Sequence, residues 1–387
     1  MGASNEHARR AYRRRRRTRR TTVSAIGVVA AVGVATAVTW SMMTLPTSRG
    51  AAAAPSSPPG TSAPAATSKP RPMTPGERLL AGTNDPRACA VSFVGEGIDL
   101  APALQATGTL YTSLPIPVRE GAVFAGWYAS ARDAADLTVE ARLNGADMVT
   151  CDERERTLHG AWVSPERHAA EDARIPILMY HQFTPRPEGE DHWLRGNYAY
   201  IGDFDDHMAY IATSGFYLPT WDELSAFIDG EILLPSRSVI VTDDDADQTW
   251  FDLAVPVIDA HEVLATSFMV TAWRQDPPPS PYVLRRSHTH DMHRAGENGD
   301  GRIVNEGVDV IAADMTTSAD ILGVAEVMAY PFGHHNETAK QGLRDAGFEM
   351  ARTIEHGYVT VGTDKLALPT IRIDYGMGLD ALIARIG

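Results

Sequence analysis

Short apolar runs alternate with amphipathic segments from Arg174 to the end of the chain, and this alternation restricts the fold more than any other feature of the sequence. Uninterrupted apolar runs are typical of strands that are buried on both faces. The segments between them repeat apolar residues at the spacing of an amphipathic helix. We therefore expect a parallel sheet or barrel, with strands at 175–180, 238–242, 265–270 and 327–331 and helices at 203–214, 250–261, 309–322 and 337–346.

Titratable residues cluster where these strands end: the aspartates of segment 243–247, the histidines of segment 287–293, and His181. The carboxyl ends of parallel strands share one face, so we expect the clusters to meet. Close carboxylates repel one another unless a cation or proton intervenes, and neutral imidazoles complete the ligand set of a divalent transition metal. Taken singly, each cluster has a plainer explanation, namely a solvated loop, a calcium site or a hydrogen-bonded core histidine. Together they favour a catalytic metal site with an open coordination position.

Several motifs occur in a fixed order: PILMYHQF, FDDHMAYIATSGFYLPTWDEL, VTDDDAD, SHTHDMH, AYPFG followed by a helix and AGFEMA, and the final LPTIRID. In these motifs, the segment from about Arg174 to Gly387 resembles the polysaccharide deacetylases (the NodB-homology family, carbohydrate esterase family 4). The branch that it resembles is typified by the poly-N-acetylglucosamine deacetylases. The resemblance implies an α/β fold, a distorted (β/α) barrel that usually has fewer than eight strands.

The resemblance also implies an activity, the metal-dependent hydrolysis of acetamide groups on a polysaccharide. It implies Asp244 as the catalytic base, His181 as the general acid, and the backbone N–H of Phe332 as a donor to the oxyanion. The expected metal is Zn²⁺, with Co²⁺ or Ni²⁺ as alternatives that accept the same ligands. The ligands that the resemblance implies are Asp245, His288 and His293.

The sequence departs from the family pattern at several positions near these residues. Asp243 stands where the family has Phe, and its carboxylate should raise the pKa of one member of the cluster. Ala246 replaces a Gly, so a positive φ at this turn would strain the chain. Ala329 replaces the Arg that commonly orients the base, Asp314 matches the supporting acid only weakly, and His290 lies between the two histidine ligands and competes with them.

The N-terminal residues show the pattern of a targeting segment. Residues 1–20 are rich in Arg, and residues 21–43 form an uncharged stretch that is long enough to cross a bilayer. The basic flank predicts a single-pass signal anchor with its N-terminus in the cytoplasm and the remainder outside the cell, or a secreted chain if the segment is cleaved. The Pro, Ala and Ser residues of 44–80 predict an extended linker. A nucleic-acid-binding arm is the alternative for the Arg-rich start, but the adjacent apolar stretch explains this start better. The rest of the chain is acidic, which argues against a nucleic-acid partner.

Segment 86–166 shows short alternating strands and predicts a small β-rich module. Cys89 and Cys151, the chain's two cysteines, flank most of it and predict a disulfide outside the cell, the alternative being two separate buried thiols. The module resembles the Listeria–Bacteroides repeat, a β-grasp-like unit. The residues that match are Gly121, Phe124, Gly126, Trp127, Tyr128 and Trp162. For Trp127 and Tyr128 we expect core packing, with stacking on sugar rings as the alternative.

These observations predict an extracellular, membrane-anchored, metal-dependent N-deacetylase whose partner is a polymer containing N-acetylglucosamine, from an exopolysaccharide or a cell wall. The alternative is a non-catalytic cell-surface protein that binds glycans through a degenerate deacetylase barrel at 174–387. Asp243, Ala246 and the repeat-like module support this alternative.

Overall fold

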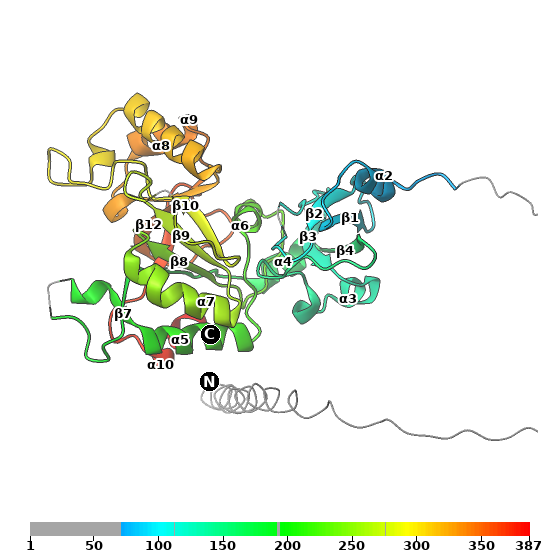
Figure 1. The fold of residues 1–387 in the computed structure, drawn as a ribbon, viewed down its shortest axis with the longest axis horizontal. Coiled ribbons are helices and arrows are strands. Elements are labelled where there is room, and N and C mark those ends of the chain that lie inside the picture. Colours follow the sequence, from blue (N-terminus) through cyan, green and yellow to red (C-terminus); the bar gives the residue numbers. More distant parts are fainter. Residues whose placement is uncertain (1–70, 112, 192–193, 275) are drawn as a thin grey trace, which may run out of the picture. The chain divides into compact units, whose positions relative to one another are not determined.

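The computed structural model describes residues 71–111, 113–191, 194–274 and 276–387 (Figure 1). Residues 74–387 form one compact unit that contains both the β-rich module and the barrel. Across the part of the chain that is described, no helix combines the length and the apolar character that crossing a bilayer requires.

The predictions for the N-terminal segments lie mostly outside the described residues: the tail 1–20, the transmembrane segment 21–43 and the linker as far as residue 70. The end of the linker 44–80 was predicted wrongly, because α2 (Pro75–Ala81) is a helix. The Oγ1 of Thr74 accepts from the N–H of Glu77 at 3.1 Å, and Oε2 of Glu77 accepts from the N–H of Thr74 at 2.6 Å. The sequence TPGE encodes this capping box. The prediction of a linker missed it because it was based on the Pro, Ala and Ser content of the whole segment.

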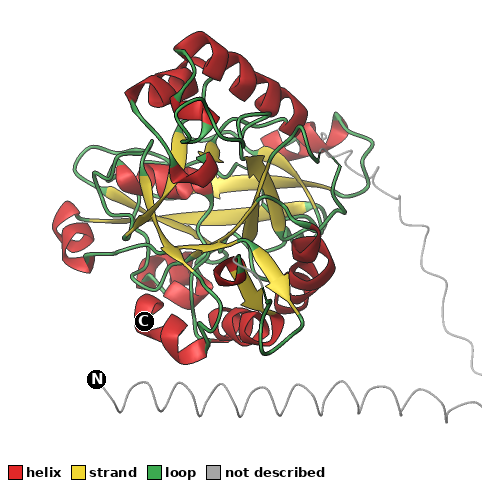
Figure 2. Ribbon diagram, turned by 90° about the vertical axis from the view of Figure 1, so that its left-hand side faces the viewer, coloured by secondary structure: helices red, strands yellow, loops and turns green. Residues whose placement is uncertain are grey.

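Seven parallel strands close a barrel in the order β10-β11-β12-β13-β5-β8-β9. Figure 2 shows these strands enclosed by helices. The expectation of a parallel barrel with fewer than eight strands is therefore confirmed. The strands are β5 (Ile177–Tyr180), β8 (Ile240–Asp244), β9 (Ala265–Met269), β10 (Val283–Ser287), β11 (Val327–Ala329), β12 (Met350–His356) and β13 (Leu368–Arg372).

The four predicted helices are present with small changes at their ends. The segment predicted as 250–261 begins with a π-helical turn (Trp250–Ala254), and the following α-helix has Pro256 in its first turn, where no N–H donor is required.

A parallel pair of short strands, β6 (Gln182–Thr184) and β7 (Tyr198–Tyr200), lies outside the barrel. The helices of this part are α5 (Ile201–Thr213), α6 (Trp221–Ile228), α7 (Val255–His261), α8 (Val308–Leu322), α9 (Glu337–Asp345) and α10 (Leu379–Ile386), with 3-10 turns at Arg195–Asn197, Arg302–Val304 and Pro331–Gly333.

The module is a four-stranded mixed sheet in the order β2-β1-β4-β3. A disulfide joins Cys89 and Cys151, whose Cα atoms lie 6.1 Å apart, as predicted. Trp127 and Tyr128 are buried, so they serve in the core and offer no face to a sugar. The module's elements are β1 (Ala88–Val94), β2 (Ala103–Ala106), β3 (Val123–Tyr128), α3 (Ala131–Asp136), the 3-10 turn Val139–Ala141 and β4 (Glu155–Val163), and α4 (Pro165–Glu171) follows them.

Backbone hydrogen bonds join the module to the barrel. The N–H of Phe124 donates to the carbonyl of Glu231 at 3.0 Å, and the N–H of Leu233 donates to the carbonyl of Phe124 at 2.7 Å. The guanidinium of Arg142, which is 4% exposed, donates to the carbonyl of Leu233 and to Oε1 of Glu223 at 3.2 Å. A buried cation is stable only with such partners, and here they come from the barrel. The junction is therefore a packed part of the fold.

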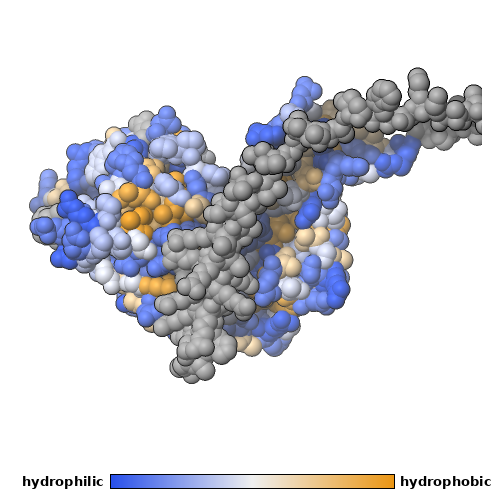
Figure 3. Space-filling model, turned by 60° about the horizontal axis from the view of Figure 1, so that its bottom comes forward, coloured by the Kyte–Doolittle hydropathy of each residue, from blue (hydrophilic) through white to orange (hydrophobic). Residues whose placement is uncertain are grey.

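The surface carries mostly hydrophilic side chains on the face shown in Figure 3, with hydrophobic residues gathered in separate patches. Among the exposed large hydrophobic residues, Trp273, Phe332 and Ile354 follow or belong to the carboxyl-terminal ends of barrel strands β9, β11 and β12. That end of the barrel is where the predicted site residues lie.

Candidate metal and catalytic site

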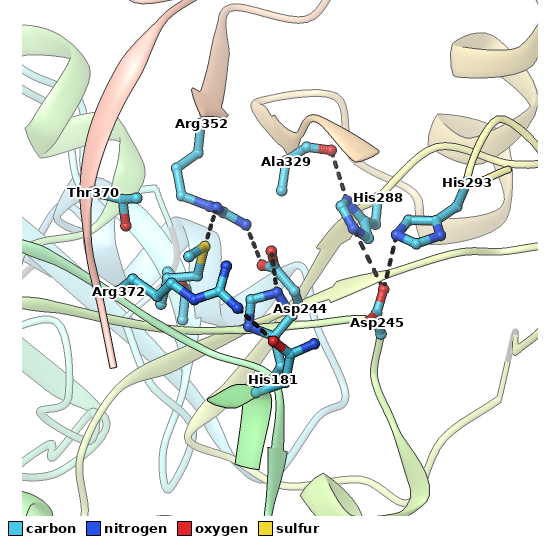
Figure 4. A network of polar contacts seen from close by, with 12 residues as sticks. His181, Asp244, Asp245, His288, His293, Ala329, Arg352, Thr370 and Arg372 are labelled. Atoms are coloured by element: carbon cyan, nitrogen blue, oxygen red, sulfur yellow. Dashed lines mark hydrogen bonds and ion pairs between the residues drawn. The ribbon is translucent and has the colours of Figure 1, made fainter. Parts of the chain in front are cut away.

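Asp245, His288 and His293 converge at the carboxyl-terminal end of the barrel (Figure 4). Oδ1 of Asp245 lies 3.1 Å from Nε2 of His293 and 3.5 Å from Nε2 of His288. One candidate ligand atom from each residue lies within 4.8 Å of the others. Asp245 directly follows β8, and His288 directly follows β10. The strand-end argument thus predicted correctly that these two loops meet.

The donor set fits a divalent cation. Nδ1 of His288 lies 2.7 Å from the carbonyl oxygen of Ala329, which can only accept, so the ring hydrogen is at Nδ1. Burial lowers the pKa of His288 to about 4, so the ring is neutral at pH 7 and Nε2 carries a lone pair. This lone pair faces a carboxylate oxygen of Asp245. Two acceptors that face each other in a buried site need a cation between them, and an imidazole held through its other nitrogen is typical of metal ligands.

Asp245 carries the negative charge that a cation ligand requires. Burial alone would raise the pKa of its carboxyl, but the imidazoles of His293 and His288 hold the pKa below its usual range. The ring of His293 packs beside those of Trp273, at 5.2 Å between centroids, and Phe332, at 4.5 Å. These rings restrict the orientation of His293.

His290 is not one of the converging residues. Nδ1 of its ring lies 3.0 Å from Oγ1 of Thr271, and its imidazole does not belong to the candidate ligand group found among the described residues. The predicted competition of His290 with its neighbours is therefore absent from this arrangement.

Asp244 lies beside the donor set and is bound by an arginine that the sequence analysis missed. The guanidinium of Arg352, on β12, donates to Oδ1 of Asp244, and both side chains are buried (Figure 4). Burial alone would raise the pKa of Asp244, but Arg352 and, to a smaller extent, His181 hold it below its usual range. Asp244 is thus ionised at neutral pH. The loss of an arginine at Ala329 is compensated from the next strand, while the carbonyl of Ala329 binds His288.

His181 completes this side of the site. Its Nε2 lies 3.7 Å from Oδ2 of Asp244, and 14% of its side chain is exposed. Burial lowers the pKa of His181, although the negative charges of Asp244 and Asp245 oppose the shift. The imidazole therefore rests in its neutral form at pH 7, with one nitrogen directed toward the base.

The two unusual residues of the VTDDDAD motif behave as their chemistry predicts. Burial raises the pKa of Asp243 well above its usual value, and the charges of Asp244 and Asp245 add to the effect. Ala246 has a φ of 51° and Asp245 a φ of 74°, so two residues with a Cβ occupy the left-handed region in succession. Such a pair is strained, and strain of this kind persists where the surrounding structure imposes it.

Phe332 lies at the rim of the same site with a φ of 59°, and 44% of its surface is exposed. Its ring contacts that of His293, a member of the donor set. The role of its N–H in binding an oxyanion stays a prediction. The structure thus brings together all of the predicted site residues and adds Arg352.

The chain is similar to known proteins over part of its length. No family model matches the chain. A poly-β-1,6-N-acetyl-D-glucosamine N-deacetylase of Staphylococcus epidermidis is 25% identical over 160 residues, which cover 36% of this chain and 55% of that protein. The Bacillus subtilis protein YxkH, described provisionally as a polysaccharide deacetylase, is 24% identical over 247 residues, covering 58% of this chain and 79% of its own length.

Two solved structures are similar to part of the chain. A Streptococcus pyogenes deacetylase in complex with acetate has a TM-score of 0.47 and 20% identity, covering 56% of this chain and 99% of its own. The IcaB protein of Ammonifex degensii has a TM-score of 0.47 and 18% identity, covering 55% of this chain and 97% of its own. The chain spans about half the length of the first curated relatives that it matches. The curated relatives confirm the resemblance to polysaccharide deacetylases that the motifs indicate.

Proposed function

We propose that the chain is a metal-dependent polysaccharide N-deacetylase that hydrolyses acetamide groups of polymers containing N-acetylglucosamine. The observation that carries this proposal is the convergence of Asp245, His288 and His293 beside an ionised Asp244. Both curated relatives support deacetylation of a polysaccharide, and the Staphylococcus epidermidis relative supports an N-acetylglucosamine polymer as the substrate.

Asp245, His288 and His293 would hold the metal, for which we propose Zn²⁺, with Co²⁺ or Ni²⁺ as alternatives. When bound, such a cation would lower the pKa of a coordinated water toward about 7 and polarise the acetamide carbonyl.

The neighbouring residues supply the proton transfers. Asp244 is ionised and accepts the proton of the attacking water, and Arg352 holds its carboxylate in one orientation. The amine of the sugar is too basic to leave as an anion, so it must receive a proton as the C–N bond breaks. His181 rests neutral and lies 3.7 Å from Asp244, so it would first take up the proton that Asp244 removes from the water and then deliver this proton to the amine. The N–H of Phe332 would donate to the oxyanion, and the products are acetate and a glucosamine unit.

The rim of the site favours a sugar polymer as the substrate. Trp273 is 62% exposed and Phe332 is 44% exposed, and both rings contact His293. Exposed aromatic faces next to a polar centre offer apolar platforms for the flat faces of sugar rings, while the polar centre binds the reacting group. A polymer would thus be held on both sides of the reacting acetamide.

For the location, we propose that the chain is anchored in the cell membrane through residues 21–43, with the barrel outside the cell, and that it is secreted if that segment is cleaved. The basic residues of 1–20 and the disulfide between Cys89 and Cys151 support this proposal, because disulfides persist in oxidising compartments.

A second candidate is a non-catalytic glycan-binding protein. The strained turn at Asp245 and Ala246 and the buried carboxyl of Asp243 favour it, because neither feature is part of the motif that the resemblance implies for catalysis. This candidate predicts glycan binding without the release of acetate.

The test is acetate release from N-acetylglucosamine oligomers by the full chain loaded with Zn²⁺. We expect Asp245→Ala and a chelator each to abolish acetate release, and Asp244→Asn to reduce it by at least about 100-fold. Asp252→Asn is the matched control, since Asp252 is exposed on the turn that follows the motif. Glycan binding that persists in Asp244→Asn, with no acetate released by the metal-loaded parent, would contradict the proposal and support the second candidate.

A further inference from the structure

We propose that Asp314 of α8 is a positioning residue for the metal site, because it fixes the loop that carries both histidine ligands. The inference rests on the proposed function, since it concerns the same site, and it adds a residue that lies outside the ligand set. Asp314 acts through the backbone of the loop and touches neither ligand side chain.

Both carboxylate oxygens of Asp314 accept hydrogen bonds from consecutive backbone amides. The N–H of His290 donates to Oδ1 at 2.8 Å, and the N–H of Asp291 donates to Oδ2 at 2.8 Å. These amides lie between His288 and His293 in the chain. A carboxylate with both oxygens occupied holds its partners in one orientation, and an ionised acceptor gives the stronger class of hydrogen bond. His290 therefore serves the site through its backbone, whereas its imidazole contacts Thr271.

The loop needs such a support because it belongs to no helix or strand. Thr289 has a φ of 75°, in the left-handed region that residues with a Cβ seldom adopt. The N–H of Met292 donates to Oγ1 of Thr289 at 3.1 Å, which closes a tight turn between the ligands. Without an external support, this turn would sample other conformations, and the two imidazoles would lose their common direction. Ordering them again on metal binding would cost conformational entropy.

Helix α8 is a rigid support for Asp314. Ile311, Met315 and Ser318 are fully buried, and together with Asp314 they form one stripe along the helix. Oγ of Ser318 lies 2.8 Å from Oγ of Ser287, the residue directly before His288. One face of the helix therefore binds the start of the loop through Ser318 and its middle through Asp314. An acidic residue on an otherwise inward-facing stripe is the sequence signal for this role.

The test is the affinity of the chelator-stripped full chain for Co²⁺, followed by the visible absorption of the bound ion. We expect Asp314→Ala to bind Co²⁺ about 10- to 100-fold more weakly than the parent, the range typical for residues that orient metal ligands. Asp314→Asn keeps one accepting oxygen, so its affinity should lie between the two. Amide hydrogen exchange at residues 290 and 291 of the metal-free chain should accelerate in Asp314→Ala.

Two control variants on the same helix separate positioning from a general loss of stability. Ile311→Val removes one buried methyl group and Asp320→Ala changes an exposed aspartate, and both should bind Co²⁺ as the parent does. Parental affinity in Asp314→Ala, or an equal loss of affinity in Ile311→Val, would overturn the inference. If Asp314→Ala does not fold, Asp314→Asn decides the question by the same criterion. A parent that binds Co²⁺ but, loaded with Zn²⁺, releases no acetate contradicts the proposed function and leaves this inference intact.

Discussion

Arg352 donates a hydrogen bond to Asp244 inside the barrel, although 108 positions separate the two residues in the chain. Asp244 lies at the end of β8 and Arg352 within β12, so the contact spans the interior of the barrel. The pair leaves the proposed base ionised in a site where burial opposes its charge.

Replacing Arg352 should impair both stability and catalysis. Arg352→Met leaves Asp244 buried without its cation, which costs about 3–5 kcal/mol in the free energy of unfolding. The pKa of Asp244 should rise, because the guanidinium is its main stabilising charge. The acidic limb of the pH profile of acetate release should therefore move to higher pH. Urea unfolding and initial rates across pH measure the two effects.

The double variant Arg352→Met/Asp244→Asn is the control for this pair. It removes both charges, so it should recover part of the lost stability while remaining inactive. An unchanged pH profile in the single variant would show that Arg352 does not control the ionisation of the base.

Asp243 should make the metal-free chain less stable as the pH rises. Its pKa in the folded chain is raised far above the usual 3.8, so the folded chain keeps a proton that the unfolded chain has lost. This contribution to stability is present below pH 3.8 and is lost as the pH rises through the folded-state pKa. Asp243→Asn cannot titrate. It should therefore be more stable than the parent at pH 8.

The measurement for Asp243→Asn is urea unfolding with a chelator present, at pH 8 and at the most acidic pH where both proteins fold. The advantage of the variant should shrink toward acidic pH. A variant that is no more stable than the parent at pH 8 would mean that the carboxyl of Asp243 finds a compensating partner.

Trp273 should contribute to substrate binding more than to the chemical step. Its exposed ring would contact the polymer equally in the ground and transition states, so Trp273→Ala should raise KM several-fold, on the order of 1 kcal/mol of binding, and leave kcat nearly unchanged. Trp273→Phe should restore part of the affinity. Val118→Ala, an exposed change in the module, is the control. A fall in kcat with an unchanged KM would instead indicate that Trp273 orients His293.

The disulfide should stabilise the module. Cys89 and Cys151 close a loop with a sequence separation of 62, and bridges of this kind typically contribute about 2–4 kcal/mol. The double variant Cys89→Ser/Cys151→Ser should unfold at a lower urea concentration, as should the reduced parent. If reduction lowers the midpoint of the parent but also that of the double variant, the effect does not come from this bond.

Much of the site was predictable because it depends on the ends of strands. Apolar runs identified β5, β8 and β9, and parallel pairing brings their carboxyl-terminal ends to one face, which placed His181 and Asp245 together. The strain at Ala246 followed from the replacement of a glycine in a turn, and its positive φ confirms the expectation.

The contacts of Arg352 and Asp314 were not predictable in the same way. Arg352 lies in a strand of mixed polar and apolar residues, and nothing local to β12 shows which distant carboxylate it reaches. Asp314 was noted as a weak match for a supporting acid, and its actual partners are two backbone amides, which carry no sequence signal. Periodicity tells which side of an element a residue occupies, whereas the partner depends on how the elements pack.

The hydrogen bonds between Phe124 and residues 231–233, together with the burial of Arg142 against Glu223, have a consequence for how this protein can be divided or recombined. A barrel excised at residue 174 would keep Glu223 without its cation and would present core residues such as Tyr217 and Trp221 to water. Replacing the module with that of another protein would expose the same residues and leave Glu223 unpaired, unless residues 231–233, which bond to the module, were exchanged together with it. The smallest unit that keeps these contacts is therefore the compact unit that starts at Thr74, within which the module and the barrel must change in concert.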